Sequence, residues 1–220
     1  MIGDIHGALN LLNKLLACLE GRQIVVVGDL CDRGPDTRGV IQRLIDVGAV
    51  GVIGNHDLWF VQWASGGELD PFAMTAVMGG RETLASYGVT PREAERRTTA
   101  PPEHAEWLSN LHLVIDLNVS GDSYWVTHAG ITSHREMSGL SPAEVVPFLA
   151  NNHPEDLLWP ANEPSSMLPV DRPIIMGHRV QKAPFDNGHT IAIDTGARYQ
   201  SGGSLTALLL PEREFVTVEG

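Results

Sequence analysis

Polar side chains that can bind a metal ion follow several of the short apolar runs of this 220-residue chain. They occur in five segments, GDIHG (3–7), GDLCDRG (28–34), GNHD (54–57), THAG (127–130) and GHR (177–179). The donors are Asp4, His6, Asp29, Asn55, His128 and His178. Carboxylate, amide and imidazole donors without a thiolate suit Mn, Fe, Zn or Mg better than a structural zinc site closed by cysteines. Two metal ions about 4 Å apart need a bridging carboxylate, and Asp29, in the middle of the first three segments, is the natural candidate.

The elements that must position these donors can be predicted from the apolar pattern. Residues 24–27 and 50–53 are short β-branched runs typical of buried strands, whereas only two residues precede the first polar segment. Helices are predicted from residue 9 to 19 and from 36 to 47. Asp4 and Asp29 are 29 − 4 = 25 residues apart and Asp29 and Asn55 are 55 − 29 = 26 apart, close to the length of one βαβ unit. Because such crossovers are nearly always right-handed, we expect all three turns at the same edge of one parallel sheet.

The rest of the chain predicts a cover and a second set of strands. Residues 58–110 are expected to form a helical insertion over one side of the site, with helices that begin at Asp70 and Thr90. A β-hairpin is predicted over 113–127, a capped helix from Ser141, and strands over 173–176, 190–193, 204–210 and 214–218. The pattern favours a single α/β domain over residues 1–220. A lone histidine is more often a structural residue, but six donors at successive strand ends are not explained in that way.

Composition excludes several functions. The formal net charge is −12 and no run of Lys or Arg is longer than Arg96-Arg97, which argues against a nucleic-acid partner. A phosphate-bearing substrate remains possible because bound metal ions can reverse the local field. The two cysteines, Cys18 and Cys31, are too few for a disulfide scaffold and favour a reducing compartment. Without a leader pattern or an apolar run of roughly 18 residues, the sequence predicts a cytoplasmic protein with no membrane partner.

Taken together, GDIHG, GDLCDRG, GNHD, the later His-Ala-Gly and the Gly-His resemble the signature of one group of phosphatases. This group is the phosphoprotein phosphatase branch of the calcineurin-like metallophosphoesterases, of the bacterial or phage serine/threonine type. The match extends to Asp194-Thr195-Gly196 and to Leu205–Leu208. The resemblance implies a β-sandwich flanked by helices, in α-β-β-α order, with two divalent ions at the strand ends. Manganese is the expected metal, with Fe, Zn, Mg, Ni or Co as alternatives.

The resemblance also implies a role for each residue. Asp4 and His6 would hold the first metal, Asn55, His128 and His178 the second, and Asp29 would bridge them. A hydroxide between the two ions would attack phosphorus directly, without a covalent phosphoenzyme. His56 would protonate the leaving oxygen, Asp32 would orient His56, and Arg33 would bind a phosphate oxygen. Substrate contacts are expected from Arg33, Asn55, His56 and Arg179.

Three departures from the family pattern bear on the substrate. The strand before the first motif is short. Asp57 stands where protein phosphatases commonly have Glu, as in symmetrical dinucleoside tetraphosphate hydrolases, yet those usually lack the carboxylate found here at Asp32. The loop near Trp159 lacks a second phosphate-binding arginine, for which Arg172, Arg179 and Arg198 are candidates.

These features predict a metal-dependent phosphomonoesterase, a serine/threonine protein phosphatase that also accepts small phosphate esters. The expected partner is therefore a phosphorylated protein or peptide, or a small phosphate ester. A symmetrical dinucleoside tetraphosphate hydrolase is the alternative enzyme. An inactive metal-binding scaffold and a purely structural α/β domain are the non-enzymatic alternatives.

Overall fold

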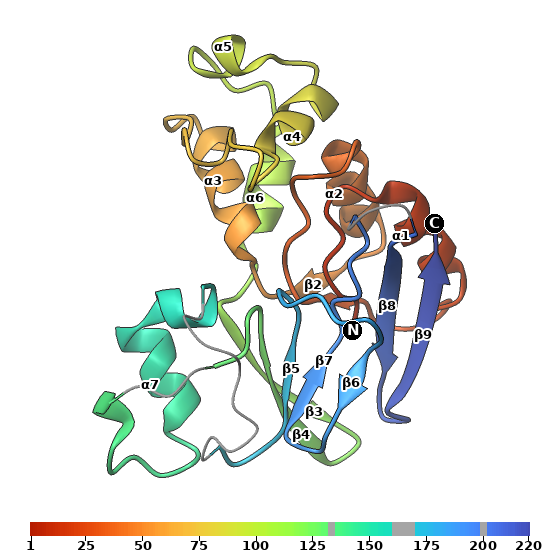
Figure 1. The fold of residues 1–220 in the computed structure, drawn as a ribbon, viewed down its shortest axis with the longest axis vertical. Coiled ribbons are helices and arrows are strands. Elements are labelled where there is room, and N and C mark those ends of the chain that lie inside the picture. Colours follow the sequence, from red (N-terminus) through yellow and green to blue (C-terminus); the bar gives the residue numbers. More distant parts are fainter. Residues whose placement is uncertain (132–134, 160–169, 199–201) are drawn as a thin grey trace.

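The computed structural model describes residues 1–131, 135–159, 170–198 and 202–220 (Figure 1). The first sheet combines a parallel pair with an antiparallel pair. Strands β1 (Val25–Val26) and β2 (Val50–Gly51) are parallel, and β8 (Ser204–Leu209) and β9 (Glu214–Glu219) form a hairpin. Ile2 joins the pairs, because it bridges to Val26 on one side and to Ala207 on the other. The short N-terminal run is thus the centre of this sheet.

The second sheet has the strand order β3-β4-β5-β7-β6. Strands β3 (Val114–Val119) and β4 (Asp122–Thr127) form the predicted hairpin, and β5 (Ile174–Met176) and β7 (Thr190–Ala192) lie parallel beside it. The edge strand β6 (Phe185–Asp186) was not predicted. Apolar side chains from both sheets meet between them, which makes a sandwich. They are Val27, Val52, Tyr124, Val126, Ile175, Ile191, Ile193 and Leu208.

Helices cover both outer faces of the sandwich, as predicted. Helices α1 (Leu9–Ala17) and α2 (Thr37–Asp46) bury their leucines and isoleucines in one cluster with Ile2, Val26 and Ala207 of the first sheet. Helix α7 (Val145–Asn152) and the 3₁₀ turn η2 (Pro154–Leu157) pack on the second sheet, against Trp125 and Ile174. A further 3₁₀ turn, η1, spans Arg135–Met137. The layers therefore follow the α-β-β-α order that the sequence led us to expect.

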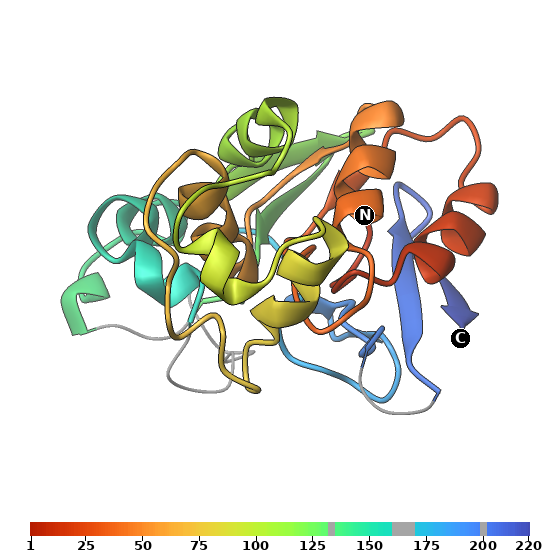
Figure 2. The ribbon, with the colours of Figure 1, turned by 90° about the horizontal axis from the view of Figure 1, so that it is seen from above.

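The segment from residue 55 to 110 is helical. It contains α3 (Asn55–Ala64), α4 (Gly80–Ser86), α5 (Pro91–Ala94) and α6 (Pro102–Ser109). These helices lie above the upper ends of the strands in Figure 1 and nearest the viewer in Figure 2. Phe60, Trp63 and Tyr87 form an aromatic cluster among them, with ring centroids 5.0 to 6.3 Å apart. Contacts inside the segment therefore hold it together.

Two predicted helix starts were wrong. Residues 71–78 form turns rather than a helix, because Asp70 Oδ1 accepts the N–H of Phe72 and folds the chain back at once. The Ser141 capping pattern forms its hydrogen bonds to Glu144, but the helix itself begins only at Val145. The capping box at Thr90 does start a helix, α5.

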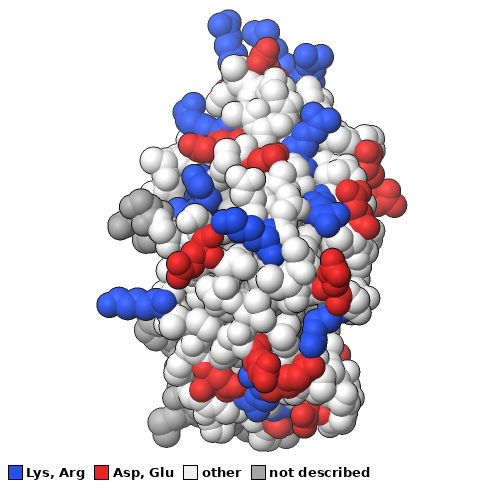
Figure 3. Space-filling model, turned by 90° about the vertical axis from the view of Figure 1, so that its right-hand side faces the viewer, with Lys and Arg blue, Asp and Glu red and all other residues white. Residues whose placement is uncertain are grey.

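Surface charges of both signs are interspersed over the described part of the face in Figure 3. Among the described residues, no helix combines the length and apolar character needed to cross a membrane.

Candidate active site

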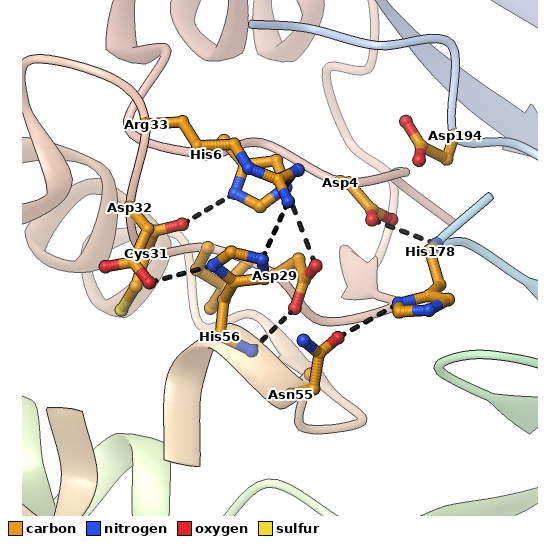
Figure 4. A network of polar contacts seen from close by, with 12 residues as sticks. Asp4, His6, Asp29, Cys31, Asp32, Arg33, Asn55, His56, His178 and Asp194 are labelled. Carbon is orange, nitrogen blue, oxygen red and sulfur yellow. Dashed lines mark hydrogen bonds and ion pairs between the residues drawn. The ribbon is translucent and has the colours of Figure 1, made fainter. Parts of the chain in front are cut away.

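Backbone hydrogen bonds lock the first two polar turns together. The N–H groups of Ile5 and His6 both donate to Asp29 O, at 3.0 Å each, and the N–H of Gly7 donates to Leu30 O. Parallel pairing through Ile2 and β1 aligns the two turns, so the prediction that they share one sheet edge is confirmed. This arrangement places Asp4, His6 and Asp29 side by side (Figure 4).

Asp57 fastens the third turn to the second. Its Oδ1 accepts the N–H groups of Leu30 (2.9 Å) and Cys31 (3.1 Å), and its Oδ2 accepts that of Gly54 (3.0 Å). The side chain is fully buried, and burial together with the charge of Asp29 raises the pKa of Asp57 to about 6. Sequence reasoning noted Asp57 only as a departure from a family pattern and missed this positioning role.

Asp57→Asn is expected to destabilise the fold by about 2–3 kcal/mol, since an amide has one acceptor oxygen and its NH₂ would face a backbone donor. Urea unfolding measures the loss. Asp46→Asn is the matched control, because the Asp46 carboxylate is exposed and, among the described residues, accepts a hydrogen bond only from Gln42. A loss below about 0.5 kcal/mol, the usual range for a surface substitution, would contradict this role.

Backbone strain is concentrated at this site. Seven described residues other than glycine have a positive φ, and five of them are His6, Asp29, Asp32, Arg33 and His178. Left-handed backbone costs an L-residue roughly 1–2 kcal/mol, so the surrounding hydrogen bonds must hold these turns in place. Close approach also requires small residues: a Cβ on Gly54 would lie 2.2 Å from Asp29 N, and one on Gly177 would lie 1.9 Å from Asp4 Oδ1.

Two groups of metal-competent atoms share Asp29. One contains His6, Asp29 and His56 and the other Asp29, His128 and His178, and within each group the donor atoms lie within 4.8 Å of one another. Asn55 Oδ1 lies 2.9 Å from both His128 Nε2 and His178 Nδ1, which are themselves 3.2 Å apart. Five of the six donors predicted from the sequence thus converge on one place, from segments far apart in the chain: His6, Asp29, Asn55, His128 and His178.

Hydrogen bonds fix the imidazole tautomers. His6 Nδ1 donates to Cys31 O (2.7 Å) and His128 Nδ1 donates to Val27 O (2.8 Å), so Nε2 of each ring faces the site. Burial lowers the pKa of His6 to about 3, and burial with the neighbouring His128 lowers that of His178 to about 4. Burial alone would lower the pKa of His128, but the carboxylate of Asp29 outweighs it and raises that pKa. A cation at Nε2 would compete with this proton.

Buried acids at the site lack enough positive partners among the described residues. Burial, followed by the charges of Asp194 and Asp29, raises the pKa of Asp4 well above its ordinary value. Burial also raises the pKa of Asp194 to about 6.

Asp4 Oδ1 and Asn55 Nδ2 are buried without a partner in the described part of the chain, and Asp4 Oδ2 accepts the N–H of His178 at 2.9 Å. Asp4 belongs to neither metal-competent group, but its carboxylate adds to a concentration of negative charge that divalent ions would relieve. The donor set therefore fits two divalent ions.

His56 and Asp32 form the predicted acid pair. His56 Nδ1 donates to Asp32 Oδ2 at 2.8 Å, and both side chains are buried. Asp32 is itself held by Trp59 Nε1 (3.0 Å) and Thr83 Oγ1 (2.8 Å). Burial raises the pKa of Asp32, while the hydrogen bond from His56 opposes that rise. The hydrogen bonds of Trp59 and Thr83 to Asp32 were not predicted. Trp59 lies one helical turn after Asn55, and this spacing could have placed it near the site, but nothing in the sequence marks Thr83.

Arg33 bridges two imidazoles of the site. Its Nη1 donates to His6 Nε2 and its Nη2 to His56 Nε2, each at 2.9 Å (Figure 4). The guanidinium therefore lies between a predicted metal ligand and the predicted acid. The Arg33 N–H donates to Gly79 O, which ties the chain just after the turns of residues 71–78 to the segment that carries Arg33.

The three other arginines considered from the sequence lie in different surroundings. Arg172 pairs with Asp171 and Asp116 and stacks 4.6 Å above the Trp125 ring, so it is engaged on the second sheet. Arg198 lines a separate cavity of about 840 Å³ beside the start of α1. Arg179 follows His178 directly and is half-buried, and it remains the candidate nearest in sequence to the site.

A family model described as calcineurin-like phosphoesterase matches residues 1–215. The chain belongs to this family. The expected superfamily is therefore confirmed, and with it a family that uses a site for two metals, for which the two His and Asp groups are the candidate ligands.

Relatives within this calcineurin-like family match nearly the whole chain. The asymmetrical bis(5'-nucleosyl)-tetraphosphatase PrpE of Oceanobacillus iheyensis is 29% identical over 240 residues, covering 99% of this chain and 90% of that protein. The PrpE of Anoxybacillus flavithermus, named in the same way, is 28% identical over 239 residues and covers 99% and 92%.

Solved structures share the fold. A protein described as a proposed diadenosine tetraphosphatase superimposes with a TM-score of 0.64 at 22% identity, covering all of this chain and 91% of that one. A cold-active protein-tyrosine phosphatase from a Shewanella species has a TM-score of 0.58 at 17% identity, with coverage of 98% and 78%. At these identities the likeness shows the architecture alone.

Proposed function

We propose that this calcineurin-like phosphoesterase is a dimetal hydrolase of dinucleoside tetraphosphates that cleaves them asymmetrically, into a nucleoside triphosphate and a nucleoside monophosphate. The names of relatives that align with 99% of the chain support this substrate over a phosphoprotein. The observation that carries the chemistry is the pair of metal-competent groups that share Asp29, one of which includes His56, whose Nδ1 is bonded to Asp32 and which we assign as the acid. We also infer one domain over residues 1–220, with residues 58–110 as its helical cover.

Two divalent ions, once bound, would lower the pKa of a water molecule toward neutrality and offset charge on the phosphoryl oxygens. In the proposed site Asp4, His6, Asp29, Asn55, His128 and His178 hold these ions. Their tautomers and buried negative charge suit that role, and manganese remains the expected metal.

The protein groups around the reacting phosphate have separate tasks. Once Arg33 has turned away from it, His56 Nε2 is free to take up a proton and give it to the leaving oxygen, while Asp32 keeps Nδ1–H pointing away from the substrate. Arg33 turns its guanidinium from the two imidazoles to the phosphate oxygens, which its fork can bind in pairs. The phosphate thereby takes the place of the two neutral imidazoles as the acceptor for the N–H groups of Arg33.

A side-by-side assay tests this function. Protein loaded with Mn²⁺ is given diadenosine tetraphosphate, a phosphoserine peptide and β-glycerophosphate, and the products are separated by chromatography. We expect AMP and ATP in equal amounts, with a kcat/KM for the dinucleotide at least about 100-fold above that for the peptide. ADP as the only nucleotide product would show symmetrical cleavage, and a preference for the peptide would restore the protein phosphatase interpretation. Either result would overturn the proposal.

A further inference from the structure

Two exposed aromatic rings lie beside the proposed metal site and take no part in the chemistry described above. Phe72 is 51% exposed and Trp159 is 45% exposed, although large aromatic side chains usually bury most of their surface. Their ring centroids are 6.5 Å apart, and the Trp159 ring lies 5.9 Å from the His178 ring, nearly perpendicular to it at 84°. Two ring contacts thus connect His178, a proposed metal ligand, to the exposed aromatic pair.

The two rings come from separate parts of the chain that are both tied to the site. Trp159 follows η2, whose Leu157 O accepts the N–H of Ala129, the residue after His128. Phe72 begins the turns of residues 71–78, and Gly79, just beyond them, accepts the N–H of Arg33. Each ring is therefore held close to a residue that we propose to bind the phosphate or a metal. An apolar surface with such anchoring is better explained by a ligand than by incidental exposure.

We propose that Phe72 and Trp159 form a stacking platform for one nucleobase of the substrate. This inference rests on the proposed function and adds to it the position of one nucleoside. Base stacking on an aromatic ring needs no hydrogen-bond code, and it accepts any base because every base has a π-face. No basic side chain is required for this contact, so the platform is compatible with the net charge of −12.

The placement of the platform also selects the phosphate that reacts. The Trp159 and His178 ring centroids are 5.9 Å apart, so a base stacked on Trp159 would leave room for its own ribose, and little more, before a phosphate held beside His178. That phosphate is the α-phosphate of the stacked nucleoside. Water adds to the α-phosphorus and releases one proton to the solvent, and the bond from this phosphorus to the α-β bridging oxygen breaks. The electron pair stays on that oxygen, which leaves as part of the nucleoside triphosphate and takes its proton from His56. The products are one nucleoside monophosphate and one triphosphate, which is asymmetrical cleavage.

Competition by two monophosphates tests the platform. Mn²⁺-loaded protein hydrolyses β-glycerophosphate, which has no ring, in the presence of AMP or of ribose 5-phosphate, which differs from AMP by lacking the base. We expect AMP to inhibit roughly tenfold more strongly in the unmodified protein. In Trp159→Ala and Phe72→Ala this ratio of inhibition constants falls toward one, and Trp159→Phe restores most of it. Because inhibition constants do not depend on the amount of active enzyme, partial misfolding of a variant does not change this ratio. Phe185→Ala is the matched control, because Phe185 is 44% exposed on β6, and it keeps the tenfold ratio.

Equal inhibition by AMP and ribose 5-phosphate in the unmodified protein would overturn the platform, as would a tenfold ratio that survives in both alanine variants. Phenyl phosphate is added as a third competitor. If it inhibits more strongly than AMP, the site prefers aryl phosphates, which would also overturn the platform. The two proposals fail separately. Cleavage of diadenosine tetraphosphate to AMP and ATP without an AMP preference would leave the function and remove the platform. An AMP preference that depends on Trp159, without cleavage of the dinucleotide, would leave the platform and remove the proposed substrate.

Discussion

His56→Asn is expected to lower kcat by about 10²–10⁴-fold, while the protein still binds two metal ions per chain. His56 Nδ1 is bonded to Asp32 and its Nε2 faces the site, so removal of the ring removes the proton donor. An acid catalyst matters most when the leaving oxygen is most basic. The loss should therefore be near the upper end for β-glycerophosphate, an alkyl ester, and near the lower end for diadenosine tetraphosphate, whose leaving group is a triphosphate.

Steady-state kinetics with both substrates, together with elemental analysis of the purified variant, measure these effects. His189→Asn is the matched control, since the His189 side chain is exposed on the turn before β7. An unchanged kcat would remove His56 as the acid. An equal loss with both substrates would show that His56 acts on the structure of the site rather than on the leaving group.

Asp29→Asn should abolish high-affinity binding of at least one metal and lower activity more than any other single substitution at the site. Asp29 Oδ1 accepts the N–H of His56 at 3.0 Å and lies 3.3 Å from His128 Nε2, and Oδ2 lies 3.5 Å from His6 Nε2. One carboxylate thus faces both metal-competent groups, and an amide can offer an oxygen to only one of them. Removal of a group that merely orients a metal ligand weakens binding about 10- to 100-fold, so loss of the bridging ligand itself should cost about 100-fold or more.

Titration of the metal-free variant with Mn²⁺, followed by calorimetry, gives the affinity and stoichiometry. Asp36→Asn is the control, because Asp36 caps α2 by accepting the N–H of Gly39 and asparagine caps equally well. Two unchanged binding events in Asp29→Asn would mean that Asp29 does not bridge.

Local patterns predicted the elements that carry the site because each is encoded over a short stretch. The β-branched runs before Gly28 and Gly54 make parallel strands, and their even spacing brings the turns together at one edge. The hairpin of residues 113–127 and the β8–β9 hairpin followed from alternation and turn residues in the same way. The six residues predicted as donors stand out in the sequence because they directly follow short apolar runs.

Long-range contacts could not be predicted. Thr83 reaches Asp32 across 51 residues of sequence, and the helical pattern around it does not show which polar side chain faces inward. Ile2 looked too short a run for a strand, yet it occupies the centre of the first sheet because partners on both sides complete its hydrogen bonds. The turns after Asp70 form because its side chain bonds two residues ahead, an interaction that competes with helix capping. Phe72 and Trp159 are adjacent only in the folded chain.

Anomalous diffraction from crystals soaked in Mn²⁺ tests the central claim most directly, because it locates manganese without assuming any ligand. We expect two peaks about 4 Å apart with the Asp29 carboxylate between them, one peak beside His6 and the other beside His128 and His178. A single peak, or two peaks with Asp29 outside coordination distance of either, would contradict it.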